Sequence, residues 1–552
     1  MQNIKLSDMT FREIRQGNFI YADKTKYIND ILQEGPNSCF FLSRPRRFGK
    51  TLLLNTIEEL FKGDRELFRG LLIDQSGYKF ERHPVLHFNM AYSEASSKDE
   101  LITRIKNNLR LEASIEGVTF IADSYGEMLG ELLKGLYEKH GATVVVLVDE
   151  YDAPLAENIM ERDIAKGIRK VLHDFYRSLK VNIRYVRMAF VTGITRFAMT
   201  ALDSGPNNFI DISLLPEFSG ICGFTIKEMN ELFGNRYDET LQVLIAESRI
   251  DQNADTEAMI NKILKYYDGY NWLGTDHILN PYSLLNFFKS CKFDTYWPLS
   301  GQPSHLSALV RKHPLEFIQP KLEGYAPKET SKAELRRVKP IPVLFHSGYL
   351  TIEKPFYKDV LINNEIVKVE YYTFKIPNTE VAMGFEITLF LDAFDPDDDF
   401  FSEFSERLPV ALLKKDSVEM ANLLHDLLSA ISFEQHEPTE KHYHAVLQSA
   451  IIAAGIEVLG QTSASQGKSD MAIFLPKKIR AVIEVKYCKT SKDDAVDTGQ
   501  AEKDFTTALD TAVDQIRSKD YAAPFRAAGK KIMGIAIAVR GRDEVAVRFI
   551  EP

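Results

Sequence analysis

Short apolar runs alternate with helical patterns over about the first 200 residues of the chain. Four runs rich in β-branched and aromatic residues predict strands, at residues 38–42, 84–89, 143–149 and 187–192. The longer segments between them carry apolar residues three and four positions apart, which predicts helices. This alternation favours an α/β fold in which helices cover a parallel sheet.

The pattern changes in the rest of the chain. Residues 225–288 have helical spacing and predict a small helical subdomain, and short alternating runs at 343–345, 349–352 and 367–374 predict a β-containing connector. Acidic residues crowd residues 392–406 around Pro396, which predicts a linker or domain edge. The remainder reads as helices followed by strand, strand, helix and strand. We therefore divide the chain into residues 1–224, 225–330, 331–404 and 405–552.

Composition agrees with several folded domains. The chain has 552 residues, of which 45% are hydrophobic and 26% charged, a balance typical of globular proteins with real cores. The formal net charge is -10, which excludes a polybasic protein that wraps nucleic acid. Any contact with nucleic acid must therefore come from local basic patches.

Cysteine usage and apolar run lengths bear on location. The four cysteines are scattered without metal-ligand spacing, which favours a reducing compartment and argues against a zinc site. The most apolar run, residues 142–148, is far shorter than the roughly 18 residues of a membrane span. The N-terminus lacks the apolar segment of a signal peptide. We expect a cytoplasmic protein without a membrane partner.

A Gly-Lys-Thr sequence stands between the first predicted strand and a predicted helix over residues 52–61. The loop amides and the helix N-terminus would face an anion, Lys50 would reach the outer phosphates, and Thr51 would hold Mg²⁺. Arg44 takes the place of the first glycine of a P-loop, although an arginine-rich loop still attracts a polyanion. The alternative is an ordinary helix start. The candidate phosphate-binding residues are Arg46, Arg47, Phe48, Gly49, Lys50 and Thr51.

Polar residues follow two further predicted strands. Asp149 and Glu150 end the third strand, so Asp149 could hold Mg²⁺ and Glu150 could activate the attacking water. Thr192 and Arg196 follow the fourth, as a candidate γ-phosphate sensor and a candidate charge stabiliser. Helix capping is the alternative for such residues.

These segments together carry a resemblance. Residues 11–15, 21–25, 41–51, 148–154 and 192–197 resemble the AAA-ATPase-like family, and residues 267–270, 280–283, 347–351 and 376–378 are similar to its central segments. In that family the first P-loop glycine is commonly replaced. The resemblance implies an AAA-like P-loop ATPase domain at 1–224, a helical lid at 225–330, the connector at 331–404 and a PD-(D/E)XK nuclease-like α/β domain at 405–552. The residues alone would fit GTP as well as ATP. The choice of ATP comes from the resemblance.

A predicted hairpin near the C-terminus places two carboxylates together. If Leu475 faces Ile479, then Asp470 lies opposite Glu484, with Cβ atoms about 4.5 to 5.5 Å apart. Such a pair needs a cation, which Mg²⁺ or Mn²⁺ would supply, and Lys486 shares the face of Glu484. Two acids and a lysine around a metal suit phosphodiester hydrolysis. A plain surface hairpin remains the alternative.

The same region resembles the PD-(D/E)XK core, with Ser469 where the name-giving proline stands. Upstream, Thr439 is a candidate N-cap, and Glu440 and His444 share a face one turn apart. The resemblance implies that these two approach the active site as accessory catalytic residues. Helix capping and a partly buried histidine explain them equally well.

Two functions follow from these patterns. The first is an ATP-binding and ATP-hydrolysing protein whose ATPase domain controls a metal-dependent nuclease acting on DNA rather than RNA. The second is an ATP-driven switch or scaffold whose nuclease-like domain only binds nucleic acid or a protein partner. ATP bound without turnover and a homo-oligomeric assembly both remain open.

Overall fold

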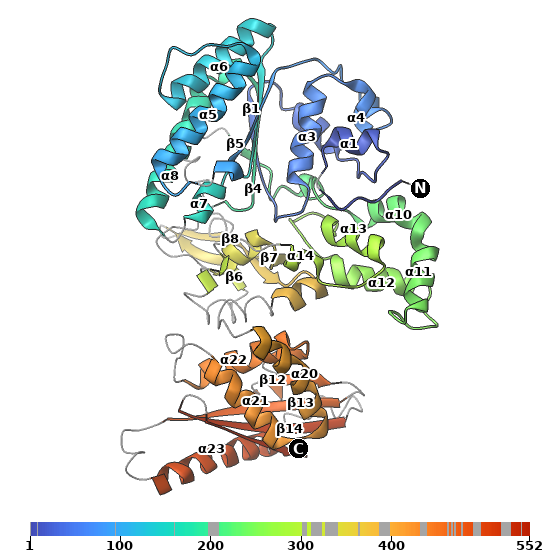
Figure 1. The fold of residues 1–552 in the computed structure, drawn as a ribbon, viewed down its shortest axis with the longest axis vertical. Helices are drawn as coiled ribbons and strands as arrows, with labels where there is room; N and C mark the ends of the chain where they lie inside the picture. Colours follow the sequence, from blue (N-terminus) through green and yellow to red (C-terminus); the bar gives the residue numbers. More distant parts are fainter. Residues whose placement is uncertain are drawn as a thin grey trace. The chain divides into compact units, whose positions relative to one another are not determined.

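The computed structural model describes most of the chain (Figure 1). The chain divides into two compact units, Met1–Leu306 with Lys321–Ala382 and Ser307–Pro320 with Met383–Pro552. The division into four domains is finer than this and stays a prediction. The described residues are 2–7, 9–93, 95–158, 161–196, 209–300, 306–307, 309–310, 323–325, 340–362, 365–385, 398–430, 439–460, 463–464, 467–468, 471–475, 479–489, 498–519, 531–541 and 544–551.

The first unit contains a parallel five-stranded sheet in the order β2-β3-β4-β1-β5. The four predicted strands are present, and the short β5 is added at one edge. β4 pairs with both β1 and β3, so the carboxyl ends of these three strands lie side by side. The strands are β1 (Ser38–Ser43), β2 (Val85–Asn89), β3 (Val144–Asp149), β4 (Val186–Gly193) and β5 (Phe209–Asp211).

Helices cover both faces of this sheet (Figure 1). On one face lies α3 (Lys50–Phe61), and on the other lie α5 (Lys98–Glu116), α6 (Tyr125–His140) and α8 (Arg162–Val181). Every residue of β3 is buried, because both faces are covered, and this explains its unbroken apolar run. The short helices of the unit include α1 (Phe11–Gln16), α2 (Thr25–Leu32), α4 (Leu72–Gln75) and α7 (Ala153–Glu157).

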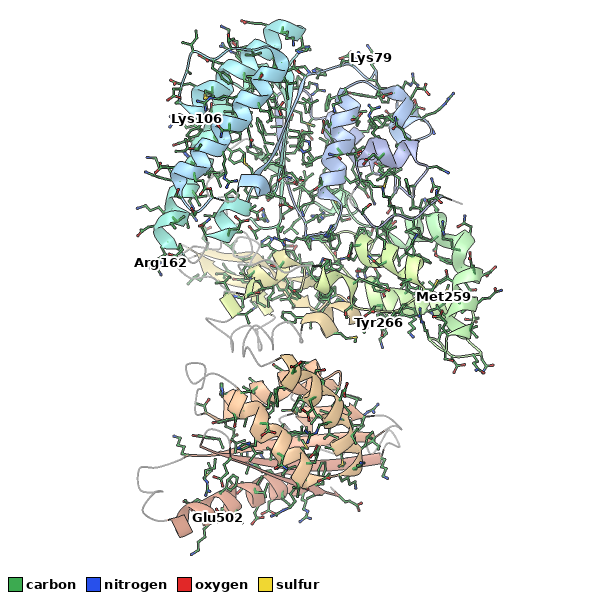
Figure 2. The ribbon with its side chains drawn as sticks, in the orientation of Figure 1. Lys79, Lys106, Arg162, Met259, Tyr266 and Glu502 are labelled. Atoms are coloured by element: carbon green, nitrogen blue, oxygen red, sulfur yellow. The ribbon has the colours of Figure 1, made fainter. Side chains whose placement is uncertain are left out.

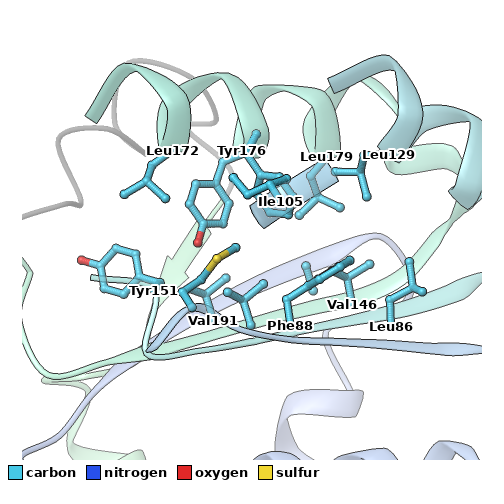
Figure 3. Close-up of a cluster of buried hydrophobic side chains, with 14 of the residues drawn as sticks. Leu86, Phe88, Ile105, Leu129, Val146, Tyr151, Leu172, Tyr176, Leu179 and Val191 are labelled. Carbon is cyan, nitrogen blue, oxygen red and sulfur yellow. The ribbon is translucent and has the colours of Figure 1, made fainter. Parts of the chain in front are cut away.

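Leucines and aromatic rings of the helices pack on valines of the sheet (Figure 3). Leu172 and Leu179 of α8 and Leu129 of α6 face the strand residues Val146 and Val191. Each buried leucine contributes about 1.5–3 kcal/mol to folding. This core fixes the sheet whose edge carries the candidate site.

The helical region expected over residues 225–288 is present. Its helices are α10 (Ile226–Phe233), α11 (Tyr237–Ala246), α12 (Thr256–Tyr267) and α13 (Pro281–Ser290). Thr225 and Glu228 form a capping box at the start of α10. The helices share an aromatic core in which Phe233 and Phe288 stack with ring centroids 4.3 Å apart, and Met259 on α12 is fully buried within it (Figure 2).

The connector contains more helix than expected. It comprises α18 (Pro340–Ser347), β7 (Thr351–Ile362), β8 (Glu365–Lys375) and a helix over 379–385. α14 (Tyr296–Leu299) and β6 (Glu323–Tyr325) precede it in the chain. The strand expected at 343–345 is wrong, because those residues lie inside α18. Residues 341–347 are all buried, and a short run that is apolar throughout does not distinguish a buried helix from a buried strand. The run at 367–374 is confirmed within β8.

The second unit contains a sheet in the order β15-β14-β13-β12-β9, with α23 connecting the parallel strands β13 and β14. Val482, Ala512 and Ala536 belong to a core cluster shared by β13, α23 and β14. Its elements are α20 (Asp398–Lys414), α21 (Ser417–Ala430), α22 (Glu440–Ala453), β9 (Glu457–Gly460), β10 (Ser463–Ala464), β11 (Gly467–Lys468), β12 (Met471–Leu475), β13 (Ile479–Cys488), α23 (Thr498–Ser518), β14 (Lys531–Arg540) and β15 (Glu544–Ile550).

The prediction that residues 392–406 form a linker or domain edge is wrong for part of the segment. Residues 398–406 belong to α20, whereas 392–397 lie outside the described residues. Phe404 and Leu408 are fully buried one turn apart, so the segment has an apolar face beneath its acidic surface. Arg407 forms ion pairs with Glu403 and Glu419, which relieve part of the charge repulsion.

The register of the C-terminal hairpin is confirmed. β12 pairs with β13 in antiparallel fashion from Leu475 opposite Ile479 to Met471 opposite Ile483. One more step would place Asp470 opposite Glu484, but Asp470 lies outside the described residues.

Among the helices that the structure describes, none is long and apolar enough to cross a membrane.

Candidate functional site

The phosphate loop joins β1 to α3. Gly49 is the N-cap of α3 with φ of 94°, a left-handed conformation that favours glycine, and no atom lies within 4 Å of where its Cβ would stand. The chain can therefore turn sharply into the helix and leave open space beside its N-terminus. Such an opening suits an anion, because the first helical N–H groups point into it.

Lys50 is buried beneath the loop. Its Nζ donates to the carbonyl oxygens of Arg44 and Pro45, at 3.0 Å each. Burial lowers the pKa of Lys50, while the nearby carboxylates of Asp149 and Glu150 act in the opposite direction. The ammonium is thus held at the base of the loop, where an outer phosphate would compete with two carbonyls for its protons.

Three strand ends meet at Asp149, as the sheet order requires. Thr51 Oγ1 donates to Asp149 Oδ2 at 2.6 Å, and Thr192 Oγ1 donates to Asp149 Oδ1 at 2.5 Å. Asp149 and Thr192 are buried, whereas Thr51 is exposed. Hydroxyl and carboxylate oxygens at this spacing are ligands of the kind that Mg²⁺ prefers. The donor set therefore fits the metal that the sequence suggests.

Glu150 stands next to this group with φ of 50°, in the left-handed region. Such a conformation is uncommon outside glycine and often accompanies functional sites. Burial raises the pKa of Glu150, and the cation of Lys50 opposes that shift. A carboxylate with a raised pKa is a better proton acceptor near neutral pH than an ordinary one.

Arg44 does not face the phosphates. Its buried guanidinium donates to the carbonyls of Ser43 (2.9 Å), Ser213 (2.8 Å) and Phe218 (3.1 Å) and lies 4.2 Å from the ring centroid of Trp272. Burial lowers its pKa to about 10. The guanidinium of Arg44 therefore stabilises the loop from within.

The next loop residues differ from Arg44. Arg46 and Arg47 are exposed, and the guanidinium of Arg47 lies 5.2 Å from the ring centroid of Tyr282 on α13. Phe48 is buried against Tyr270 and Trp272, which anchors the loop. It also borders the cavity above the loop.

Arg196 forms an ion pair with Asp211 at the end of β5. Nearby, Asp152 accepts hydrogen bonds from the backbone N–H of Thr195 (2.6 Å), from its hydroxyl (2.6 Å) and from the N–H of Ile194 (3.2 Å). Asp152 thus ties the loop after β3 to the loop after β4.

A cavity of about 720 Å³ opens over the phosphate loop, within the size range of small-molecule sites. Its lining includes Arg46, Arg47, Gly49, Lys50, Thr51 and Glu150. The N-terminal segment and α13 supply apolar lining, including Ile4, Leu6, Phe19 and Leu285. The cavity therefore combines a cationic phosphate loop with a lining that is partly apolar and partly polar, the latter including Lys5 and Lys24.

A second group of candidate residues meets on the C-terminal sheet. Lys486 Nζ lies 3.2 Å from Glu484 Oε1 and 3.2 Å from Glu440 Oε1. Burial alone would lower the pKa of Lys486, but the two carboxylates together raise it. The structure thus brings Glu484 and Lys486 of β13 together with Glu440 of α22, as the sequence predicts.

The side-chain hydroxyl of Thr439 accepts a hydrogen bond from the His442 N–H, which confirms it as the N-cap of α22. His444 is buried one turn after Glu440. No group of three or more His, Cys, Asp or Glu side chains that could hold a metal occurs among the described residues, and Asp470 lies outside them. Glu484 and Glu440 supply hard oxygen donors of the type a divalent metal requires, so the residues present fit such an ion.

Comparison with family models matches both regions. Residues 6–203 match the model described as "Predicted AAA-ATPase", and residues 438–549 match the model of the PD-(D/E)XK nuclease superfamily. The chain joins an AAA-ATPase-like domain to a PD-(D/E)XK domain. This layout confirms the resemblance found in the sequence.

A curated relative spans the whole AAA-ATPase-like and PD-(D/E)XK layout. The "Uncharacterized protein in vnfD 5'region" of Azotobacter chroococcum mcd 1 is 27% identical over 557 residues, which cover 100% of this chain and 98% of that protein.

Solved structures show a weaker likeness. A chain of the Drosophila ORC structure bound to GC-rich DNA and Cdc6 matches at 13% identity and a TM-score of 0.20, covering 50% of this chain and 93% of that one. Cdc6p from Pyrobaculum aerophilum matches at 13% identity and a TM-score of 0.22, covering 66% and 91%. The fold assignment rests on the parallel sheet and the two family models.

Three residues of the AAA-ATPase-like unit escaped the sequence analysis. Asp152 stood within a family-like segment but had no assigned role. Trp297 donates a hydrogen bond to the phosphate loop, and Glu380 accepts one from Trp297. Neither residue belongs to a recognisable motif. The nearby resemblance at residues 280–283 and 376–378 was the available signal, and it pointed to segments rather than to side chains.

Proposed function

We propose that the N-terminal unit binds and hydrolyses ATP with Mg²⁺. The observation that supports this most directly is the meeting of Thr51, Asp149 and Thr192 at one sheet edge, beneath a cavity whose lining also includes Lys50 and Glu150. Asn89 also lines this cavity, at the end of β2.

Each residue has a proposed role. The loop N–H groups and Lys50 bind the phosphates, and Thr51 with Asp149 would hold Mg²⁺, which when bound neutralises phosphate charge. Glu150 accepts the proton of the attacking water, and Thr192 orients Asp149 and senses the γ-phosphate. Arg46 and Arg47 contribute positive charge at the cavity rim. Arg196 could stabilise charge only after leaving Asp211.

Glu150→Gln tests this role. The variant keeps the side-chain shape but cannot accept the proton, so we expect ATP binding within about twofold of wild type and at least a hundredfold slower hydrolysis. A matched control is Glu161→Gln, on the surface at the start of α8. Unchanged hydrolysis in Glu150→Gln would reject Glu150 as the base, and absence of ATP binding by the wild type would reject the function.

We further propose that the C-terminal unit cleaves DNA in the presence of Mg²⁺ or Mn²⁺, with Asp470 and Glu484 as metal ligands. Lys486 would orient the attacking water or offset charge on the phosphate. Glu440 holds the Lys486 ammonium beside Glu484, and His444 is an accessory residue on the same helix. A divalent metal would supply a Lewis acid for the phosphodiester. Arg480 and Lys489 add local positive charge for the backbone.

Nicking of supercoiled plasmid in Mn²⁺ tests the nuclease. Lys486→Ala is expected to lose nicking by at least a hundredfold, whereas Lys414→Ala, which removes an exposed charge from the end of α20, should nick like the wild type. Equal nicking by all three proteins would point to a contaminant. Running each reaction with and without ATP tests whether the ATPase controls cleavage.

The second candidate is a switch or scaffold that binds nucleic acid or a protein partner without cutting. It draws support from Lys486, which already offers both Glu484 and Glu440 a cation and so makes a metal dispensable for stability. DNA binding without nicking in Mg²⁺ or Mn²⁺ would favour this candidate. The same two assays test the proposed DNA substrate.

A further inference from the structure

The phosphate loop is supported from outside the sheet domain. The indole Nε1 of Trp297, on α14, donates to the carbonyl of Arg46 at 3.0 Å. Gly348 also approaches the loop so closely that a Cβ there would stand 2.8 Å from Pro45 and 2.9 Å from Trp297. Gly348 has φ of 92°, so both backbone conformation and space require glycine.

Trp297 is held in turn by Glu380, from the helix over 379–385. Glu380 is fully buried, and its Oε1 accepts from the backbone N–H groups of Tyr296 (2.7 Å) and Trp297 (2.9 Å). The hydroxyl of Ser283, on α13, lies 2.9 and 2.7 Å from its two oxygens. One buried carboxylate therefore caps α14 and joins it to α13.

The position of this carboxylate in the chain is unusual. The chain passes from the first unit to the second after Leu306 and again after Ala382. Among the helices and strands whose bounds are given above, α14 is the last before the first crossing, and Glu380 precedes the second crossing by two residues. Glu380 thus links the two segments that lead out of the first unit, through contacts made wholly within that unit.

α13 adds a second route to the loop. Tyr282 precedes Ser283, and its ring receives the guanidinium of Arg47. Glu380 therefore reaches two consecutive loop residues, Arg46 through Trp297 and Arg47 through α13. A shift of the loop on nucleotide binding would be felt at Glu380 by both routes, because Glu380 and Trp297 are buried and close-packed, and Arg47 contacts α13 directly.

We propose that Trp297 and Glu380 are positioning residues that hold the phosphate loop in its binding conformation and transmit nucleotide occupancy to the chain segments leading to the C-terminal unit. The proposal rests on nucleotide binding at the loop. It assigns the two residues no contact with the nucleotide itself.

Hydrogen exchange of the full-length protein, with and without a non-hydrolysable ATP analogue, tests the proposal. In wild type the analogue should slow exchange in peptides covering the phosphate loop, residues 294–300 and residues 376–385. Trp297→Phe keeps an aromatic ring but removes the donor to Arg46. We expect it to bind the analogue about three- to tenfold more weakly and, at saturating analogue, to lose the effect at 376–385 while keeping it at the loop.

Glu380→Gln provides the second variant. It keeps the side-chain volume but places an amide N–H₂ group among the N–H and hydroxyl donors that contact Glu380. We therefore expect the analogue no longer to slow hydrogen exchange at residues 294–300 and 376–385. Ser290→Ala is the matched control, because Ser290 contacts Tyr296 from the exposed side and touches neither Glu380 nor Arg46. It should behave as wild type. In Trp297→Phe the remaining tryptophan, Trp272, reports by its emission that the loop region is folded.

The outcomes separate the two proposals. Binding of the analogue with no change at 376–385 in wild type, or an equal change in Trp297→Phe at saturation, would overturn the positioning role and leave ATP binding intact. If wild type binds no analogue and shows no protection at the loop, the proposed ATP binding fails and the positioning role fails with it.

Discussion

Buried charged side chains lie around the cavity over the phosphate loop. Some are bound by backbone carbonyls and one by a carboxylate. Arg44 and Lys50 rest on backbone carbonyls, whereas Lys24 pairs with Glu228 of α10 at 2.7 Å. Isolated buried charges are costly, so each of these groups has hydrogen-bond partners that offset the loss of water. The carbonyls around Arg44 come from segments far apart in sequence, which makes its role structural.

Arg44→Met should therefore destabilise the first unit. The substitution strands the carbonyls of Ser43, Ser213 and Phe218, and we expect the unfolding free energy to fall by about 2–4 kcal/mol. Urea denaturation followed by tryptophan emission measures this, because the two tryptophans of the chain both contact the phosphate loop. Arg46→Met is the control: it should unfold within about 0.5 kcal/mol of wild type yet bind ATP more weakly. If instead Arg44→Met kept its stability and bound ATP more weakly, Arg44 would be assigned to phosphate binding.

The roles of Lys50 and Thr51 could be predicted because they depend on local order: strand, loop, helix. The role of Arg44 could not, since its partners at Ser213 and Phe218 are about 170 residues away in the chain. The role of Glu380 could not be predicted for the same reason. Nothing near it in the sequence indicates that α13 and α14 both contact its carboxylate.

Glu380 should make stability depend on pH. Burial raises its pKa to about 7, with the N–H of Trp297 and the hydroxyl of Ser283 acting in the opposite direction. The folded state therefore holds the proton more tightly than the unfolded chain, whose value is near 4.5. This contribution is complete below pH 4.5 and is lost as pH rises through 7, by up to about 3 kcal/mol.

Urea unfolding of wild type and Glu380→Gln between pH 4.5 and 8 measures this contribution. The difference in unfolding free energy between the two proteins should shrink or reverse as pH rises. A difference that stays constant across this range would mean that Glu380 keeps an ordinary pKa in its buried position.

At the level of elements, the ends of β3 and β4 are fitted to one another. A Cβ on Gly193, the last residue of β4, would stand 2.5 Å from both Asp152 Oδ1 and the ring of Tyr151. Tyr151 in turn donates its hydroxyl to the carbonyl of Thr195 at 2.9 Å. The loop that carries Glu150 and the loop that follows Thr192 are thus packed without spare room.

Gly193→Ala should disturb both loops. Overpacking at a buried strand end costs about 1–3 kcal/mol, and we expect a lower kcat for ATP hydrolysis with little change in ATP affinity, because the phosphate loop itself is untouched. Gly234→Ala is the matched control, since no atom lies within 4 Å of its Cβ position. Steady-state hydrolysis and nucleotide titration measure the two effects. Equal kcat in the two variants would show that the loops have room to adjust.

The elements themselves were predictable to different degrees. The central parallel strands were readable because burial on both faces leaves an apolar run, and the register of β12 and β13 followed from one pairing, Leu475 with Ile479. α18 and the start of α20 were missed. In α18 the first six positions are all apolar, before His346 and Ser347, and in α20 acidic residues mask the spacing of Phe404 and Leu408. Neither segment therefore shows a readable period.

For the whole molecule, any effect of ATP on DNA binding would have to be reciprocal. If ATP changes the affinity for DNA, then DNA must change the affinity for ATP by the same factor, for which 5- to 150-fold is typical of coupled sites. The net charge of -10 means that DNA binding depends on local patches such as Arg480, Lys486 and Lys489, so the coupling should be measured at low salt.

This measurement uses the Lys486→Ala variant, because it should bind the DNA duplex without cutting it. Lys489 is left unchanged, so that the rest of the basic patch can still contact DNA. Titration of a fluorescent ATP analogue with and without a short DNA duplex gives one factor, and titration of the duplex with and without the analogue gives the other. Equal factors above about five would establish communication between the units. Factors of one in both directions would mean that ATP binding and DNA binding are thermodynamically independent, so that any control by ATP would act on the rate of cleavage and not on DNA affinity.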